Sequence, residues 1–256
     1  MNRVSLALGR RALFASLASL VFVLASALAL PARADGNESL AKVDKTVNAW
    51  KSIDYHFTVT TKSGASSTVL KLRSRMKNKG AYNKQFIDIS EPADMAGTKV
   101  LTTKPTKMYI YLPAFKKIRR IASHVNEQGF LGTALASKDL DLTHYGVHYD
   151  ATEGGDVGGK LKLMLTAKGE TAPYPKLEML IDKSKWVPAE IKYLNEAGKV
   201  LKTETRGGYF CEGDYCAPKS MAVVDHTKNV SSTLELTEYK INPKLEKGLF
   251  SKRNLN

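Results

Sequence analysis

Two histidines four residues apart are the first candidate for chemistry in this sequence. On a helix, His144 and His148 would lie on one face, where two imidazoles can share a metal ion. However, Tyr145, Val147 and Tyr149 alternate with smaller or polar residues, which predicts a strand. Four residues of strand span about 13 Å at about 3.3 Å each, too far for a shared ion. We therefore expect solvated strand histidines and no metal site.

No other grouping of residues has the spacing of a familiar catalytic or nucleotide site. The sequence lacks the G-x-S-x-G, H-E-x-x-H and P-loop patterns. Its glycine run at 154–159 is followed by Lys160 and Leu161, which favours a hairpin turn over a phosphate-binding loop. We expect no enzyme and no cofactor. A hydrolase whose catalytic groups meet only in three dimensions is a minor alternative.

Cys211 and Cys216 are the two cysteines of the chain. In an oxidising compartment two nearby cysteines usually pair. The residues between them, Glu-Gly-Asp-Tyr at 212–215, favour a turn, so the bridge would staple a hairpin. A metal site needs more ligands than these two, and a redox site more often has the C-x-x-C spacing. We predict a structural disulfide.

The first 34 residues indicate an oxidising destination. They contain four Arg and no acidic residue, an apolar stretch at 12–30 and an Ala-Arg-Ala pattern at 32–34. These features are typical of a secretory signal peptide that is cleaved after residue 34. An uncleaved membrane anchor is the alternative, because the 19 residues at 12–30 are just long enough to cross a bilayer. The absence of a cysteine near the cleavage point argues against a lipid-anchored lipoprotein.

The chain is strongly basic, with a formal net charge of +14 over 256 residues. Without residues 1–34 it has 222 residues, with 35 Lys or Arg against 25 Asp or Glu, and a charge of +10. Nucleic acid is the usual partner of so basic a chain, but an exported protein rarely meets it. Anionic lipid head groups or acidic protein surfaces are the better partners.

The elements that must position these residues are mainly strands. One helix is predicted near residue 40, where apolar residues recur at steps of three and four. Its apolar face comprises Leu40, Val43, Val47 and Trp50, with Asn37 or Ser39 as the cap. Beyond it, about a dozen segments alternate apolar with polar residues. The clearest are 55–59, 70–76, 108–112, 161–165, 177–181, 187–193 and 234–236.

This alternation predicts an antiparallel sheet with an apolar inner face and a wet outer face. Turn residues at 78–80, 154–159 and 196–198 separate several of the strands. No repeat and no Pro/Ser-rich linker divides the chain. We therefore predict a single domain over 35–256, in which a long antiparallel sheet curls around an apolar interior.

Residues 91–142 interrupt the alternation. Their apolar residues outside regular strands include Phe115, Ile118, Ile121, Phe130, Leu131 and Leu135. We expect loops and short helices that lie over the sheet, either as a lid over a cavity or as ordinary core. The same region holds a dense basic run, which comprises Lys116, Lys117, Arg119 and Arg120. Such a run is often simply solvated, but its apolar neighbours also suit contact with anionic head groups or an acidic membrane partner.

Three segments of this region, PADMAGTKVL (92–101), MYIYLPAFKKIRRI (108–121) and QGFLGTALASKDL (128–140), occur in a fixed order. Together they resemble the outer-membrane lipoprotein-sorting, or LolA/LolB-like, superfamily, in its largely uncharacterised periplasmic branch. The segment at 241–251 is similar to the closing segment of that family. The resemblance covers about residues 38–253.

The resemblance implies a mainly β, α+β fold: an unclosed antiparallel β-barrel of about eleven strands with a helical lid. The hollow would accept the acyl chains of a lipoprotein or another lipid, whose exposure to water costs about 0.8 kcal/mol per CH₂. The candidates for the cavity and lid are Met108, Ile110, Leu112, Phe115, Ile118, Phe130, Leu131, Leu163 and Leu165. Arg119 and Arg120 are candidates for an arginine that holds the lid.

Our leading hypothesis is a monomeric carrier in the periplasm of a Gram-negative envelope. It would hold lipoprotein acyl chains or another lipid for transfer toward the outer membrane, with transient membrane contact and no nucleic acid. The alternative is an accessory or sensor module that docks on an inner-membrane transporter or signalling protein through residues 116–120.

Overall fold

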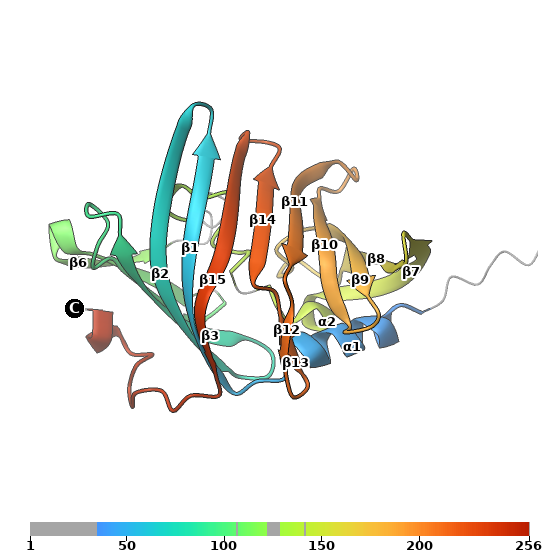
Figure 1. Cartoon of the computed structure of the whole chain (residues 1–256), viewed down its shortest axis with the longest axis horizontal. Helices are drawn as coiled ribbons and strands as arrows, with labels where there is room; N and C mark the ends of the chain where they lie inside the picture. Colours follow the sequence, from blue (N-terminus) through green and yellow to red (C-terminus); the bar gives the residue numbers. More distant parts are fainter. Residues whose placement is uncertain (1–34, 106, 122–128, 141, 256) are drawn as a thin grey trace, which may run out of the picture. The chain divides into compact units, whose positions relative to one another are not determined.

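A computed structural model describes residues 35–105, 107–121, 129–140 and 142–255. The predicted signal peptide at 1–34 lies outside these residues. The alternating segments form one antiparallel sheet of thirteen strands, in the order β6-β5-β4-β3-β2-β1-β15-β14-β11-β10-β9-β8-β7 (Figure 1). Because the order ends at β6 and β7, the sheet is open. The predicted unclosed, mainly β fold is therefore confirmed, with thirteen strands rather than about eleven.

The strands of this sheet are β1 (Ser52–Ser63), β2 (Ser66–Asn78), β3 (Asn83–Glu91), β4 (Lys99–Lys104), β5 (Lys107–Leu112), β6 (Lys117–Ile121), β7 (Tyr149–Val157), β8 (Lys160–Ala167), β9 (Lys176–Asp182), β10 (Val187–Leu194), β11 (Val200–Gly207), β14 (Ser220–Asp225) and β15 (Val230–Ile241). A separate hairpin consists of β12 (Phe210–Glu212) and β13 (Tyr215–Ala217). The helices are α1 (Asn37–Val47) and α2 (Tyr145–His148), with 3-10 turns η1 (Pro113–Phe115), η3 (Phe130–Gly132) and η4 (Lys252–Leu255).

The chain builds the sheet as two meanders joined by its last strands. Strands β1 to β6 and strands β7 to β11 each run from neighbour to neighbour, and β14 and β15 close the gap between them. The glycine run predicted as a hairpin does connect β7 to β8, where Gly158 and Gly159 have φ values of 58° and 78°. Such left-handed pairs suit tight hairpin turns. Gly154 and Gly155 belong to β7 itself.

The predicted first helix is confirmed as α1, but its cap differs. Gly36 is the N-cap, and no side chain caps it by a hydrogen bond. Asn37 instead accepts a hydrogen bond from Ala151 N at 2.8 Å, which ties the helix to β7. Trp50 lies beyond the helix, and its indole donates to Val47 O at 3.0 Å.

The strand predicted across His144 and His148 is wrong. Residues 145–148 form α2, and the strand begins only at Tyr149. The Asp44 carboxylate of α1 accepts the backbone N–H groups of Tyr145 and Gly146 at 2.9 and 2.7 Å. This tertiary contact favours a helical turn. His144 is consequently buried, with its Nε2 3.3 Å from Asn83 Oδ1, rather than solvated. Within the described residues no group of three or more His, Cys, Asp or Glu could hold a metal ion.

Apolar side chains pack on both faces of the sheet. We call the face that carries Val59 and Leu163 the inner face; α1 and the segment 129–140 lie against it (Figure 1). The outer face of β3 to β5 is covered by the C-terminal segment, whose Leu249 and Leu255 pack on Phe86. None of the helices within the described ranges is long and apolar enough to cross a membrane.

Candidate functional site

A cavity of about 190 Å³ lies on the inner face of the sheet, below the segment 129–140. Its main wall consists of apolar side chains from β1, β2, β3 and β15. These are Ile53, Phe57, Val59, Leu70, Leu72, Met76, Ile87 and Leu234. The opposite side is closed by Phe130, Leu135, Leu140 and Leu142, and one end by the β12–β13 hairpin. The site is therefore an apolar hollow between a strand surface and an irregular cover.

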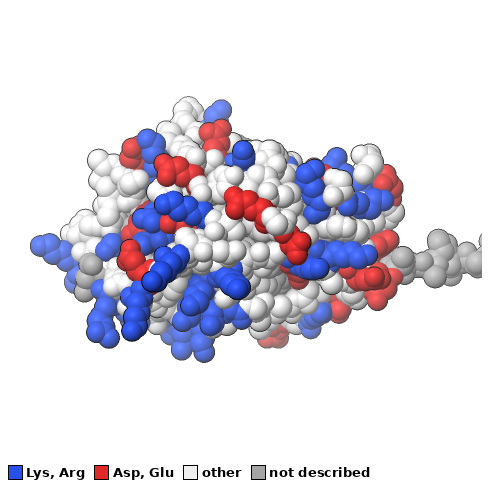
Figure 2. All heavy atoms as spheres, turned by 60° about the horizontal axis from the view of Figure 1, so that its bottom comes forward, with Lys and Arg blue, Asp and Glu red and all other residues white. Residues whose placement is uncertain are grey.

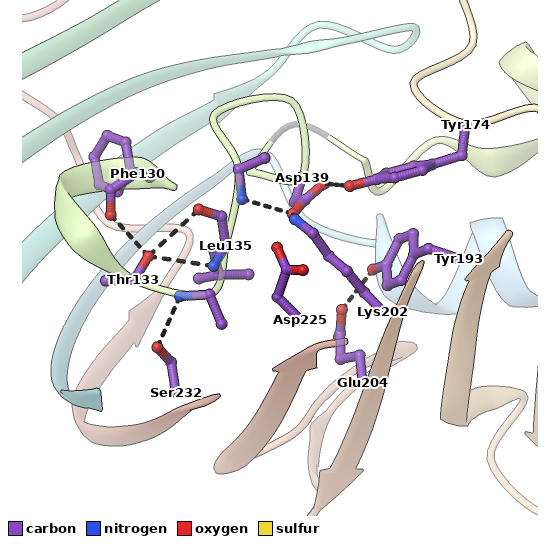
Figure 3. Close-up of polar contacts among 12 residues, drawn as sticks. Phe130, Thr133, Leu135, Asp139, Tyr174, Tyr193, Lys202, Glu204, Asp225 and Ser232 are labelled. Atoms are coloured by element: carbon purple, nitrogen blue, oxygen red, sulfur yellow. Dashed lines mark hydrogen bonds and ion pairs between the residues drawn. The ribbon is translucent and has the colours of Figure 1, made fainter. Parts of the chain in front are cut away.

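The cover at 129–140 is held in place by apolar and polar contacts together. Phe130 and Leu135 are buried in the same core cluster as Val59. Thr133 Oγ1 donates to Phe130 O at 2.7 Å, and Ala134 N donates to Ser232 Oγ of β15 at 2.9 Å (Figure 3). These contacts close a tight loop and fasten it to the strand beneath. We call residues 129–140 the lid.

Asp139 anchors the far end of the lid. Its carboxylate is 2.7 Å from Lys202 Nζ of β11 and accepts hydrogen bonds from Tyr174 OH at 2.6 Å and Ala136 N at 2.7 Å (Figure 3). The side chains of Asp139 and Lys202 are only 2% and 7% exposed. A buried ion pair is tolerated when further hydrogen bonds satisfy its charges, as they do here. The lid is thus latched to the sheet by a buried charge.

A second buried pair lies two residues further along β11. Glu204 accepts hydrogen bonds from Tyr193 OH at 2.5 Å and from Arg206 Nε. Arg206 Nη2 also donates to Tyr145 OH at 3.2 Å. Burial opposes the charge of Arg206, but the neighbouring Glu204 carboxylate holds its pKa well above the ordinary value. Both Glu204 and Arg206 line the cavity, so its apolar wall ends in a charged group.

The β12–β13 hairpin closes the cavity with a disulfide. Cys211 and Cys216 are bonded, with an S–S distance of 2.03 Å, which confirms the predicted staple. Tyr215 of this hairpin hydrogen-bonds the hydroxyl of Tyr55 on β1, and burial raises the pKa of Tyr215 to about 12. Tyr215 and Cys216 both line the cavity. The disulfide therefore stiffens a wall of the hollow.

The structure separates the residues that the sequence grouped as cavity and lid candidates. Phe130 lines the cavity. Met108, Ile110 and Leu131 pack in the same core cluster without belonging to the lining. Leu163 and Leu165 are 0% and 1% exposed in a different core cluster, beneath α1. That part of the inner face is filled by helix side chains rather than left open.

The remaining three candidates lie at the β5–β6 end of the sheet. Leu112 is half-buried, and Phe115 in η1 is 62% exposed. Ile118 is opposite Tyr111 in the β5–β6 pairing, so it shares the outer face and packs against the C-terminal segment. Opposite residues in a sheet point to the same side, and this register decides the face of Ile118.

The basic run lies at the open edge of the sheet. Lys116, Lys117, Arg119 and Arg120 are exposed, at the start of β6 and along it, and the cavity lining includes none of them. Lys and Arg side chains gather on one part of the molecular face drawn in Figure 2. The run is therefore a surface feature of the sheet edge and not part of the cavity wall.

Sequence reasoning missed most of the true lining. Segments 55–59, 70–76 and 234–236 were predicted as strands, and their apolar faces form the main wall. The charged end was hidden, because Lys202, Glu204 and Arg206 alternate along β11. Such a pattern usually indicates a solvent face. Only the tertiary structure turns it inward.

Comparison with known proteins assigns the fold. A family model described as an uncharacterized protein matches residues 81–256, and no curated protein matches the sequence. An outer membrane lipoprotein-sorting protein domain from Vibrio parahaemolyticus has a similar structure, with a TM-score of 0.78 and 22% identity, covering 86% of this chain and 97% of that one. A DUF1329 family protein from Desulfovibrio piger gives 0.79 and 19%, covering 86% and 98%.

A LolA superfamily protein from Nitrosomonas europaea is similar as well, with a TM-score of 0.69 and 17% identity, covering 86% of this chain and 99% of that one. At such identities the likeness concerns the fold, and it confirms the resemblance predicted from residues 92–140. The chain belongs to the uncharacterized protein family matched over residues 81–256, and its fold is that of the LolA superfamily and the lipoprotein-sorting domains.

Proposed function

We propose that this protein is a carrier that holds the apolar part of a lipid or lipoprotein in the cavity beneath the lid. The observation that carries the proposal is the apolar cavity between the thirteen-stranded sheet and the lid. An acyl chain exposed to water is unfavourable by about 0.8 kcal/mol per CH₂, so transit through an aqueous compartment requires such a container. The lipoprotein-sorting fold supports this role.

We further propose that the carrier acts in the periplasm, after cleavage of residues 1–34, and delivers its cargo toward the outer membrane. The exposed basic run at 116–120 would meet anionic head groups or an acidic membrane partner there. This contact is electrostatic and peripheral. Charge reversal in the run should therefore leave the amount of bound cargo unchanged.

The test is to isolate the exported protein from periplasm, extract it with organic solvent and identify bound lipids and acylated peptides by mass spectrometry. Leu72→Trp, which puts a larger side chain into the cavity, should reduce the amount of bound lipid severalfold. Val69→Trp is the matched control, because Val69 lies on the same strand and is 43% exposed. Lipid-free wild-type protein, or equal lipid in both variants, would refute the carrier role.

A further inference from the structure

We infer that the cavity takes a single-chain amphiphile with an anionic oxygen head group, with the head at Arg206 and the chain along one row of inner-face side chains. This inference rests on the proposed carrier function and names the class of cargo. It follows from the register of five neighbouring strands, the contacts of one guanidinium group and the size of the hollow.

One continuous row of side chains crosses the sheet from Arg206. Arg206 on β11 is opposite Met221 on β14, and Met221 is opposite Leu234 on β15. Leu234 is opposite Val59 on β1, and Val59 is opposite Leu70 on β2. All five side chains line the cavity. Four strand-to-strand steps of about 4.8 Å give a track of about 19 Å, with a cation at one end and apolar groups along the rest.

The guanidinium of Arg206 has donors to spare. It is 13% exposed and carries five N–H groups. Among the described residues its partners are Glu204, through Nε, and the hydroxyl of Tyr145, through Nη2. The Nη1 group has no partner in this part of the chain, and the residue lines the cavity. Unsatisfied donors beside an apolar hollow favour a ligand that brings an acceptor to them.

The charge of the site selects the head group. Hydrogen bonds from a guanidinium to a carboxylate or phosphate are charge-assisted and roughly twice as strong as neutral ones. The Glu204 carboxylate already accepts hydrogen bonds from Tyr193 OH and from Arg206 Nε. It therefore balances the charge of Arg206 in the empty site and leaves the Nη1 group available to a ligand. An ammonium head would face a buried cation, and an alkane would leave the donors unpaired.

The dimensions favour one chain. A cavity of about 190 Å³ is smaller than most small-molecule sites, which measure about 300–1,000 Å³. The neighbouring row toward the lid, Glu204 to Val223 to Ser232, is closed because Ala134 N binds Ser232 Oγ. A cargo with several acyl chains would have to displace that lid contact.

The experiment compares four ligands with one sixteen-carbon chain on delipidated mature protein at pH 8, below their aggregation concentrations. The ligands are palmitate, hexadecyl phosphate, hexadecanol and hexadecylamine. Trp50 lines the cavity, so its fluorescence reports binding, and calorimetry gives the affinity. We expect palmitate or hexadecyl phosphate to bind at least tenfold more tightly than hexadecanol, and hexadecylamine to bind most weakly. Whichever of the two acids binds more tightly identifies carboxylate or phosphate as the natural head group.

Arg206→Gln should remove this tenfold preference, so that the two acids and hexadecanol bind with similar affinity. Since that change leaves Glu204 unpaired, the neutral double variant Glu204→Gln/Arg206→Gln provides a second test with the same expectation. Arg73→Gln is the control, because Arg73 is also ion-paired, with Asp54 at 2.6 Å, but does not line the cavity. Equal binding of all four ligands to the wild type would overturn the inference alone. Binding of none of them would overturn the carrier function as well.

Discussion

The two halves of the inner face have the same strand pattern and opposite outcomes. Under α1, the side chains of β7 to β10 form a solid core in which Leu163, Leu177 and Ile181 are fully buried. Under the lid, equivalent apolar rows on β1, β2 and β15 enclose a cavity. We call these regions the packed half and the hollow half. The strand pattern alone therefore does not determine whether an apolar face is filled.

The difference comes from the cover. In the packed half a regular helix places Leu40 and Val43 on the sheet at helical spacing, and both are at most 1% exposed. In the hollow half the lid is irregular and is fastened at a few points, such as Ala134 to Ser232 and Asp139 to Lys202. A cover fastened at separate points can leave space between them, whereas a helix that packs along its whole face cannot.

The largest expected effect is at the buried pair of Asp139 and Lys202, which fastens the lid to the sheet. We call this pair the latch. Asp139→Ala leaves Lys202 charged and buried without its partner, and should lower the free energy of unfolding by about 3–5 kcal/mol. Urea denaturation monitored by circular dichroism measures this. The double variant Asp139→Leu/Lys202→Met removes both charges and should regain most of the loss. A single variant within 1 kcal/mol of wild type, on the order of an exposed ion pair, would show that the latch is not a structural charge pair.

The second prediction compares one leucine from each half. Leu163→Ala in the packed half should lower the free energy of unfolding by about 2–5 kcal/mol, because it opens a void in close-packed surroundings. Leu72→Ala removes the same atoms from a half-buried position that already borders the cavity, and should cost about 1 kcal/mol. Matched urea unfolding curves test the pair. Equal losses would erase the distinction between the halves.

The third prediction concerns the packed half and pH. Burial raises the pKa of Asp44 to about 6 from 3.8, although the backbone N–H groups of Tyr145 and Gly146 and the charge of Lys168 oppose the rise. Because the folded pKa is the higher one, Asp44 stabilises the fold below pH 4, and this contribution disappears as the pH rises to about 6. The shift corresponds to about 3 kcal/mol.

Asp44→Asn cannot titrate, so the stability difference between wild type and variant should move against the wild type by about 3 kcal/mol from pH 3.5 to 7. Urea unfolding of both proteins at those two pH values provides the measurement. Asp54→Asn is a useful contrast, because its hydrogen bond with Arg73 lowers the pKa of Asp54 and the difference should run the opposite way. Parallel pH profiles of wild type and Asp44→Asn would contradict the prediction.

Local patterns were sufficient for the elements. Alternation predicted the strands, the three-and-four spacing predicted α1, and the composition around Cys211 and Cys216 predicted the stapled hairpin, because side-chain period and turn chemistry act over a few residues. The one strand predicted wrongly, across His144 and His148, failed because Asp44, a hundred residues away, holds that turn in a helical form.

The sequence by itself determined which strand faces are mostly apolar and which superfamily the lid motif resembles. It did not determine what each apolar face meets, since hydrophobicity is non-directional and equally satisfied by a helix, a lid or a ligand. The tertiary structure decided that Leu163 and Leu165 are packed beneath α1 and that Ile118 belongs to the outer face. It also decided that Glu204 and Arg206, whose alternating polar pattern is typical of a solvent-exposed strand face, lie at one end of the cavity. Those outcomes depend on strand register and on the segment that covers each strand, which are set by contacts between residues far apart in the chain.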